Sequence, residues 1–342
     1  MLNNGIVVPA LLPFQELEQK VWITEMCAGC RGCITVCPAN TLAYDLKLAR
    51  PYQITPCVDC KACLEACPRT PANLEKLPSA DVIGPYLDIK NAKARAGNSR
   101  YQNGGVATVL LKAALEEELV DHVIVMGSDR WAQKAYVRVI EDPSDLDRSA
   151  GSKYMNNDIL EVMRDVMKDD RIKNVALVGT PCTIQTVGLL RNSSNEYSAK
   201  LTQKIRFMIG LFCYESFSDS LIPEISSRLG VPSWRIAKMN AGEGKLTITL
   251  RSGEEKQLPL SSLSQFVKPG CRKCNDFTSK LSDISVGSVG SAPGSSVVIT
   301  RTADGAGLFE IAKELGHIET ADGVNVEAIE KIGKLKLKRN GF

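Results

Sequence analysis

The sequence has very little histidine, no long apolar run and almost no net charge, and each shortage narrows what the protein can do. It contains only two histidines in 342 residues, His122 and His317. Neither lies in a motif, so we expect structural roles for both and no histidine catalyst. No apolar run approaches the roughly 18 residues that a membrane-spanning helix needs. The net charge of +3 is too small to favour nucleic acid as a partner.

The first residues lack the features of an export signal. No basic residue precedes the short apolar stretch in MLNNGIVVPALLPFQ (1–15), so we expect a cytoplasmic protein. The chain has 12 cysteines, and reducing compartments keep thiols free rather than paired in disulfides. Clustered thiols in such a protein usually bind metal or carry redox chemistry.

Eight of these cysteines form two copies of one pattern. The segments CAGCRGCITVCP (27–38) and CVDCKACLEACP (57–68) both read C-x2-C-x2-C-x3-C-P. This is the pattern of bacterial two-cluster ferredoxins, in which the fourth cysteine of each run binds the other run's cluster. The predicted ligands are Cys27, Cys30, Cys33 and Cys67 for the first [4Fe–4S] cluster, and Cys57, Cys60, Cys63 and Cys37 for the second. Two zinc sites would explain neither the third cysteine of each run nor the prolines that follow.

The segment after the second cysteine run is rich in proline. The segment RTPANLEKLPSADVIGPYLD (69–88) has three prolines and little periodicity, which is typical of a linker. We therefore expect an N-terminal extension over 1–24, a bacterial-type two-cluster ferredoxin domain over 25–78, a linker over 79–100 and a larger domain over 101–342.

Beyond residue 100, apolar strands alternate with amphipathic helices. The predicted elements are a glycine-opened helix at 103–120, strands at 122–127 and 136–141, a helix at 156–168 capped by Asn156 or Asn157, a strand, turn and helix at 173–190, a strand ending at Cys213, a hairpin at 245–260 and two β-like runs at 283–302. Such alternation predicts an α/β fold with a mixed sheet.

The other four cysteines are dispersed along this domain. Cys182 and Cys213 stand just past the ends of predicted strands, and Cys271 and Cys274 lie in GCRKCND (270–276). Because α/β sheets place their sites at strand ends, these four thiols could meet. They suit a third [4Fe–4S] cluster or a structural zinc, and their spacing also leaves free thiols or a redox pair open.

Six sequence blocks, in order, resemble the family of coenzyme F420 hydrogenase/dehydrogenase beta subunits. They are NGGVAT (103–108), GSKY (151–154), GTPCTIQ (179–185), GLFCYES (210–216), GCRKCNDFTS (270–279) and DISVGSVGS (283–291). The ferredoxin-like segment ahead of them is similar to that of the F420H2 dehydrogenase members of the family, so the resemblance covers residues 25–340. It implies a domain that binds FAD and coenzyme F420, a deazaflavin, and a third [4Fe–4S] cluster on Cys182, Cys213, Cys271 and Cys274.

The same blocks contain the residues that would hold these cofactors. Glycines at a helix start let the backbone approach a pyrophosphate, although no G-x-G-x-x-G motif is present. Lys153 is the candidate for a positive charge near the flavin ring, and Thr180 and Gln185 would place that ring near the third cluster. The full implied set is Asn103, Gly104, Gly105, Thr108, Ser152, Lys153, Tyr154, Thr180, Gln185, Ser285 and Gly287.

The resemblance implies an F420 oxidoreductase. Hydride would pass from F420H2 to FAD, and single electrons would leave through three [4Fe–4S] clusters, in a direction that can reverse. Hydride transfer between juxtaposed rings needs no acid–base residue, and a flavin links two-electron to one-electron chemistry. The expected partner is a membrane respiratory complex, a heterodisulfide reductase or a hydrogenase, with at most peripheral membrane association through it. Two alternatives stay open: an electron-transfer protein without its own substrate, and a related flavin iron–sulfur reductase of another substrate, such as a bilin- or chlorophyll-type pigment.

Overall fold

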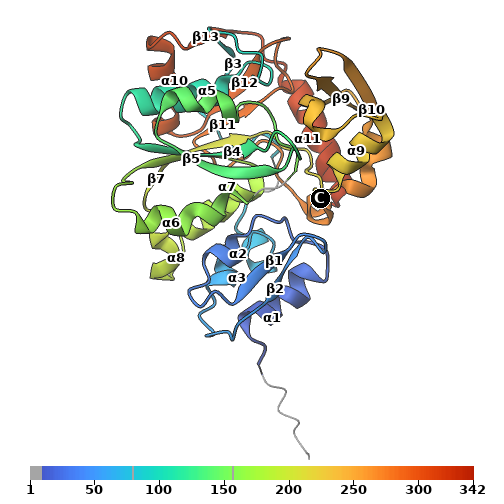
Figure 1. The fold of residues 1–342 in the computed structure, drawn as a ribbon. Coiled ribbons are helices and arrows are strands. Elements are labelled where there is room, and N and C mark those ends of the chain that lie inside the picture. The colour runs from blue at the N-terminus through green and yellow to red at the C-terminus, as the bar shows by residue number, and fades with distance from the viewer. Residues whose placement is uncertain (1–9, 79–80, 156–157) are drawn as a thin grey trace, which may run out of the picture.

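An eight-stranded mixed sheet forms the centre of the larger part of the molecule (Figure 1). The computed structural model describes residues 10–78, 81–155 and 158–342. The strand order is β13-β3-β12-β11-β7-β6-β4-β5. The parallel strands are β4 (His122–Ser128), β6 (Val175–Gly179), β7 (Ile205–Leu211) and β11 (Ile284–Gly287). The antiparallel strands are β5 (Ala135–Ile140), β12 (Ser296–Thr300), β3 (Asp88–Ala94) and β13 (Ile318–Ala321). The predicted mixed α/β sheet is confirmed.

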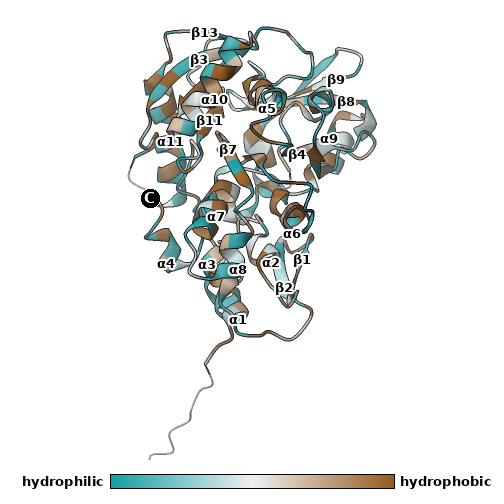
Figure 2. Ribbon diagram, turned by 90° about the vertical axis from the view of Figure 1, so that its left-hand side faces the viewer, coloured by the Kyte–Doolittle hydropathy of each residue, from teal (hydrophilic) through white to brown (hydrophobic). Residues whose placement is uncertain are grey.

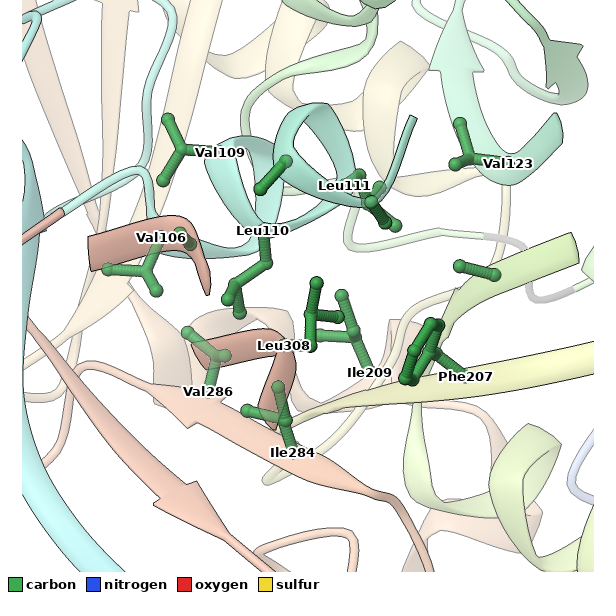
Figure 3. Close-up of a cluster of buried hydrophobic side chains, with 14 of the residues drawn as sticks. Val106, Val109, Leu110, Leu111, Val123, Phe207, Ile209, Ile284, Val286 and Leu308 are labelled. Carbon is green, nitrogen blue, oxygen red and sulfur yellow. The ribbon is translucent and has the colours of Figure 1, made fainter. Parts of the chain in front are cut away.

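Helices cover both faces of this sheet. Helices α5 (Val106–Glu116) and α10 (Ala303–Glu314) pack on one face, where Leu110 and Leu308 meet Ile209 (Figure 3). Because side chains alternate along a strand, β7 also contributes side chains to the opposite face, where Met208 packs in a second apolar cluster. That face is covered by α6 (Met163–Lys168), α7 (Pro181–Arg191) and α11 (Val326–Asn340). The result is a three-layer arrangement with the sheet in the middle.

A small antiparallel sheet stands beside the large one (Figure 1). It consists of β8 (Ile236–Gly242), β9 (Lys245–Leu250) and β10 (Glu255–Pro259), and it has its own apolar core with α9 (Leu221–Leu229). The hairpin predicted at 245–260 is β9 and β10. The remaining short helices of this part are α8 (Glu196–Lys200) and the 3-10 turns η2 (Pro143–Ser149), η3 (Ile159–Val162), η4 (Ser233–Arg235), η5 (Leu260–Phe266) and η6 (Pro269–Lys273).

The first cysteine-rich segment forms a separate small lobe below the sheet in Figure 1. Its elements are α1 (Pro13–Leu17), the π-helical η1 (Glu18–Trp22), α2 (Gly32–Thr35), the hairpin strands β1 (Leu42–Asp45) and β2 (Arg50–Gln53), α3 (Ala62–Ala66) and α4 (Pro71–Leu74). Figure 2 shows α2 and α3 beneath α7, and α3 contacts α7 directly. A second link joins α6 to the α2 segment, where Arg164 donates hydrogen bonds to the carbonyls of Ile34 and Cys37.

Two segments differ from the elements expected from the sequence. Residues 79–100, predicted as a linker, contain β3, which pairs with β12 and β13 inside the large sheet. The helix expected at 156–168 is a 3-10 turn, η3, followed by the short α6, because the same apolar spacing suits either helix. The expected caps, Asn156 and Asn157, lie outside the described residues. Within the described ranges, no helix is both long and apolar enough to cross a membrane.

Candidate active site

A cavity of about 690 Å³ opens at the carboxyl ends of the parallel strands. Its volume lies in the range of small-molecule and cofactor sites, and α/β sheets commonly bind ligands at this edge. Thr180 follows β6, Cys213 follows β7, and Gly287 ends β11; all three line the cavity. The turn between β8 and β9 and the last helix α11 form the opposite wall, through residues such as Glu243 and Ile332.

Most of the residues implied as cofactor-binding lie in this cavity, and three do not. The lining residues are Asn103, Gly105, Thr108, Ser152, Lys153, Tyr154, Thr180 and Gly287. Gly104 lies behind the wall, where its N–H donates to Ser296 Oγ at 3.2 Å. Ser285 is buried and hydrogen-bonded to Ser282. Gln185 is buried on the far side of the thiols described below, with its side chain toward Arg69.

The start of α5 suits an anionic group. Gly105 is the residue before this helix and has φ +69°, and an added Cβ would lie 2.2 Å from the ring of Tyr101. Only glycine fits there. The first helical residues, including Thr108, line the cavity, so the backbone N–H groups and the positive end of the helix dipole lie at its wall.

Lys153 places a further cation in the cavity wall. Its Nζ donates hydrogen bonds to the carbonyls of Ala150 at 3.0 Å and Gly151 at 2.8 Å. Burial, together with the charges of Arg100 and Arg138, lowers the pKa of Lys153 to about 7. Its protonation is therefore sensitive to any negative charge that enters the cavity.

Tyr154 joins the small sheet to the cavity. Its hydroxyl accepts a hydrogen bond from the backbone N–H of Ala241 at 3.0 Å. Gln102 adds a second link by donating to Asn240 Oδ1 at 2.7 Å. The β8–β9 turn is thereby held over the cavity, a placement that the sequence did not indicate.

The four dispersed thiols come together next to this cavity. Cys182 lies in the first turn of α7, Cys213 follows β7, and Cys271 and Cys274 lie in and just after η6. Burial raises the pKa of Cys213; the positive charge of Lys336 opposes this shift, and the other three thiols add to it. Burial also raises the pKa of Cys182 to about 11. The mutual effects show that these thiols are electrostatic neighbours.

The cavity and the four-thiol site share one wall. Cys213 belongs to both. Thr180 lines the cavity and has its hydroxyl 3.3 Å from Cys182 Sγ. Ser216 also lines the cavity, and its backbone N–H donates to Cys271 Sγ at 3.3 Å. A ring bound in the cavity would thus lie next to whatever the thiols hold.

In the small lobe, the eight remaining thiols fall into two groups. Burial raises the pKa of Cys67, and Cys30 and Cys27 of the first run raise it further. Burial likewise raises the pKa of Cys63 to about 12, with contributions from Cys60, Cys37 and Cys57. Each run's fourth cysteine therefore lies with the first three of the other run, as expected for the exchanged ligation of two-cluster ferredoxins.

The first group of lobe thiols adjoins the four-thiol site. Cys30 packs against Cys182, and Thr186 Oγ1 of α7 donates to Cys30 Sγ at 3.3 Å. The contact is tight: a Cβ on Gly32 would lie 2.4 Å from Thr186 Cγ2, and one on Gly270 would lie 2.1 Å from Cys27 O. The sites therefore follow one another in the order cavity, four-thiol site, first lobe site and second lobe site.

Sequence reasoning missed two buried cations beside the thiols. Lys336 is 1% exposed, and its Nζ donates to the carbonyls of Cys213 and Asp276, both at 2.6 Å. Arg69 is also 1% exposed. Burial alone would raise the pKa of Cys274, but Lys336 and Arg69 reverse the shift and lower it. Arg69 could have been noticed because it directly follows a Cys-Pro pair, whereas Lys336 stands in a basic run that looks solvated.

The two histidines pair with carboxylates away from the cavity wall. His122 Nδ1 is 2.8 Å from Asp121 Oδ1, and His317 contacts Glu116. In the described part of the chain, no group of three or more His, Cys, Asp or Glu side chains is arranged to hold a single metal ion.

Comparison with known proteins gives the family. Two models of the coenzyme F420 hydrogenase/dehydrogenase beta subunit match: the N-terminal model covers residues 91–164, and the C-terminal model covers residues 172–325. A 4Fe-4S dicluster domain model matches residues 20–68. The chain therefore belongs to the family of coenzyme F420 hydrogenase/dehydrogenase beta subunits, with a 4Fe-4S dicluster domain at its N-terminal side.

Named relatives agree with this assignment. The beta subunit of the coenzyme F420 hydrogenase of Methanothermobacter thermautotrophicus is 31% identical over 70% of this chain and 85% of its own length. The F subunit of the F420H2 dehydrogenase of Methanosarcina mazei is 28% identical over 92% of this chain and 90% of its own. A chain in the solved F420-reducing [NiFe] hydrogenase complex from Methanosarcina barkeri matches with a TM-score of 0.72 at 27% identity, covering 78% of this chain and 93% of that chain. The expected family and fold are thereby confirmed.

Proposed function

We propose that the chain is an F420H2 oxidoreductase that uses FAD and three [4Fe–4S] clusters to deliver electrons to a partner complex. FAD supplies the link between hydride exchange with the deazaflavin and one-electron transfer to the clusters. The observation that carries the proposal is the wall shared by the cavity and the four-thiol site, to which Cys213 contributes. The partner would be a membrane respiratory complex, a heterodisulfide reductase or a hydrogenase.

The cavity residues bind and orient the flavin in this proposal. The start of α5 receives the pyrophosphate, because Gly105 lets the backbone turn into the helix without a clash with Tyr101. Lys153 offers its charge to the anionic cofactor. Tyr154 keeps the β8–β9 turn in place over the cavity through its hydrogen bond with Ala241, which limits the access of water.

The thiols hold the three clusters and set the path. Cys182, Cys213, Cys271 and Cys274 ligate the cluster next to the cavity, and the two lobe groups ligate the others. Backbone N–H groups support the sulfurs, as from Thr41 to Cys37 Sγ at 3.2 Å and from Asp59 to Cys57 Sγ at 3.4 Å. The loop that carries Cys57 and Cys60 is exposed at Val58, Asp59 and Lys61, whereas residues 28–33 of the first run are buried. The second lobe site therefore lies nearest to solvent and is the exit toward the partner.

The test is anaerobic oxidation of F420H2 by the purified, FAD-supplied chain with a viologen dye as acceptor. Iron and flavin contents are measured on the same sample, with about twelve irons expected for three [4Fe–4S] clusters. Turnover with this composition supports the proposal. Bound flavin and full iron without turnover would assign a different substrate, and a chain that takes up no flavin would be an electron-transfer protein only. Zinc in place of iron at the third site would contradict the cluster assignment there.

A further inference from the structure

Arg69 lies buried between two of the thiol sites. Its Nη1 donates to Gln185 Oε1 at 3.1 Å and to the carbonyl of its neighbour Pro68 at 3.3 Å. Its Nε and Nη2 are buried without any hydrogen-bond partner among the described residues. Burial of an arginine in this way lowers the stability of the fold unless a compensating charge and acceptors for its N–H groups are present.

The groups around this charge are cysteine thiols from two different sites. No carboxylate in the described ranges forms an ion pair with Arg69 at 4.0 Å or less. Arg69 follows Cys67 by two residues, and its hydrogen-bond partner Gln185 stands three residues after Cys182 on α7. The thiols that act electrostatically on the guanidinium are Cys274 and Cys182 of the four-thiol site and Cys30 and Cys67 of the first lobe site. No thiol of the second lobe site is among them.

We propose that Arg69 is the shared counter-charge of the first lobe cluster and of the cluster next to the cavity, and that it raises the reduction potential of both. The inference rests on the proposed function, since it needs clusters at these thiols. A cluster becomes more negative when it accepts an electron, and a fixed cation in a low-dielectric interior therefore stabilises its reduced form. The N–H groups of Nε and Nη2 are left free to donate to cluster sulfurs.

Gln185 is the positioning residue for this cation. It is 1% exposed and holds Arg69 through its Oε1, while its Nε2 lies 3.5 Å from Asp276 Oδ2. With one cation serving both sites, a change at Arg69 shifts both potentials in the same direction and leaves the difference between them largely unchanged. The second lobe cluster keeps its own potential and is tuned separately.

The experiment is an anaerobic redox titration of the FAD-supplied full chain, followed by electron paramagnetic resonance of each cluster. In Arg69→Gln, we expect the equilibrium constant for reduction to fall at least tenfold at the first lobe cluster and at the cavity-side cluster. For a one-electron couple, this fall lowers each reduction potential by about 59 mV. The second lobe cluster should not move. Arg69→Lys, which keeps the charge, should retain most of the wild-type potentials.

Arg191→Gln serves as the matched control. This exposed arginine, the last residue of α7, donates to Ile205 O at 2.7 Å and has no thiol among the groups that shift its pKa, so no cluster potential should change. Full iron content with unshifted potentials in Arg69→Gln would overturn the inference, and so would equal shifts in all three clusters. A wild-type protein with fewer clusters would instead contradict the proposed function.

A second variant covers the case in which Arg69→Gln does not assemble. Gln185→Glu keeps the arginine and puts a carboxylate within 3.1 Å of its Nη1, which neutralises the cation where it stands. The same two clusters should again shift to the negative. Loss of iron from both variants would overturn the inference, because Arg69 would then be needed to assemble the sites rather than to set their potentials.

Discussion

Replacing Gly270 by alanine should loosen the contact between the small lobe and the large domain. An added Cβ would lie 2.1 Å from the carbonyl oxygen of Cys27 and 2.9 Å from the nitrogen of Ala28. Both are backbone atoms, so no side-chain rotation can relieve the clash. The contact must lengthen by more than 1 Å to reach the ordinary separation of 3.4 Å. Overpacking of this kind typically costs about 1–3 kcal/mol.

Two measurements test this expectation. Anaerobic denaturant unfolding should show the loss in stability, and stopped-flow spectroscopy should separate two steps. Reduction of bound flavin by F420H2 should keep its rate, because the cavity is untouched, whereas the following reduction of the lobe clusters should slow. Gly307→Ala is the control: this glycine is exposed in α10 with no atom within 4 Å of its would-be Cβ, and alanine there should stabilise the helix by up to about 1 kcal/mol. If Gly270→Ala unfolds like the wild type and passes electrons at the same rate, close contact at this glycine is not what couples the two parts.

Three further predictions address the thiols and the buried lysines. Cys274→Ser should lose about four of about twelve irons and keep the signals of both lobe clusters; an unchanged iron content would remove this thiol from the ligand set. Because the pKa of Lys153 is lowered to about 7, the free protein loses that charge as the pH rises, so binding an anionic flavin must take up a proton. FAD affinity, measured by fluorescence titration, should therefore fall above about pH 7, and Lys153→Met should abolish this dependence. Lys336→Met removes two hydrogen bonds of 2.6 Å and should lower the free energy of unfolding by about 1.5–3 kcal/mol for each bond to the charged donor. In the exposed control Lys334→Met, the free energy of unfolding should change by less than about 1 kcal/mol. Equal effects of the two variants would refute a special role for the buried lysine.

The parallel strands could be predicted from the sequence because they are buried on both faces. Strands β4, β6 and β7 are continuous apolar runs, and each is followed by a recognisable turn or helix. Strand β3 has the sequence DIKNAKA, in which four of the seven residues are polar. It reads as a linker, although Asn91 and Ala92 are buried once β12 and β13 pair with it. Strand β3 joins the sheet through backbone hydrogen bonds, and these need no pattern of apolar residues in the sequence.

The site was predictable where residue type carries the chemistry. Cysteine spacing indicated the lobe thiols, and strand ends indicated the meeting of Cys182 with Cys213. Charge gave no comparable signal, because a lysine such as Lys336 reads the same in a sequence whether it is solvated or 1% exposed. The cavity wall formed by the β8–β9 turn was missed for the same reason, since its polar and glycine residues look like any exposed hairpin.

Exposure of the loops that carry the thiols gives the proposed electron path its direction. Residues 28–33 of the first run are buried, whereas Val58, Asp59 and Lys61 beside Cys57 and Cys60 are exposed. A cluster sealed behind the cavity can exchange electrons only with its neighbours, and one near the surface can meet another protein. Since Gly32 and Gly270 fix the middle of the path by tight contacts, the lobe is better described as a rigid extension of the cavity than as a mobile carrier. Under the proposed function, the partner therefore docks at the second lobe site, around Cys57 and Cys60.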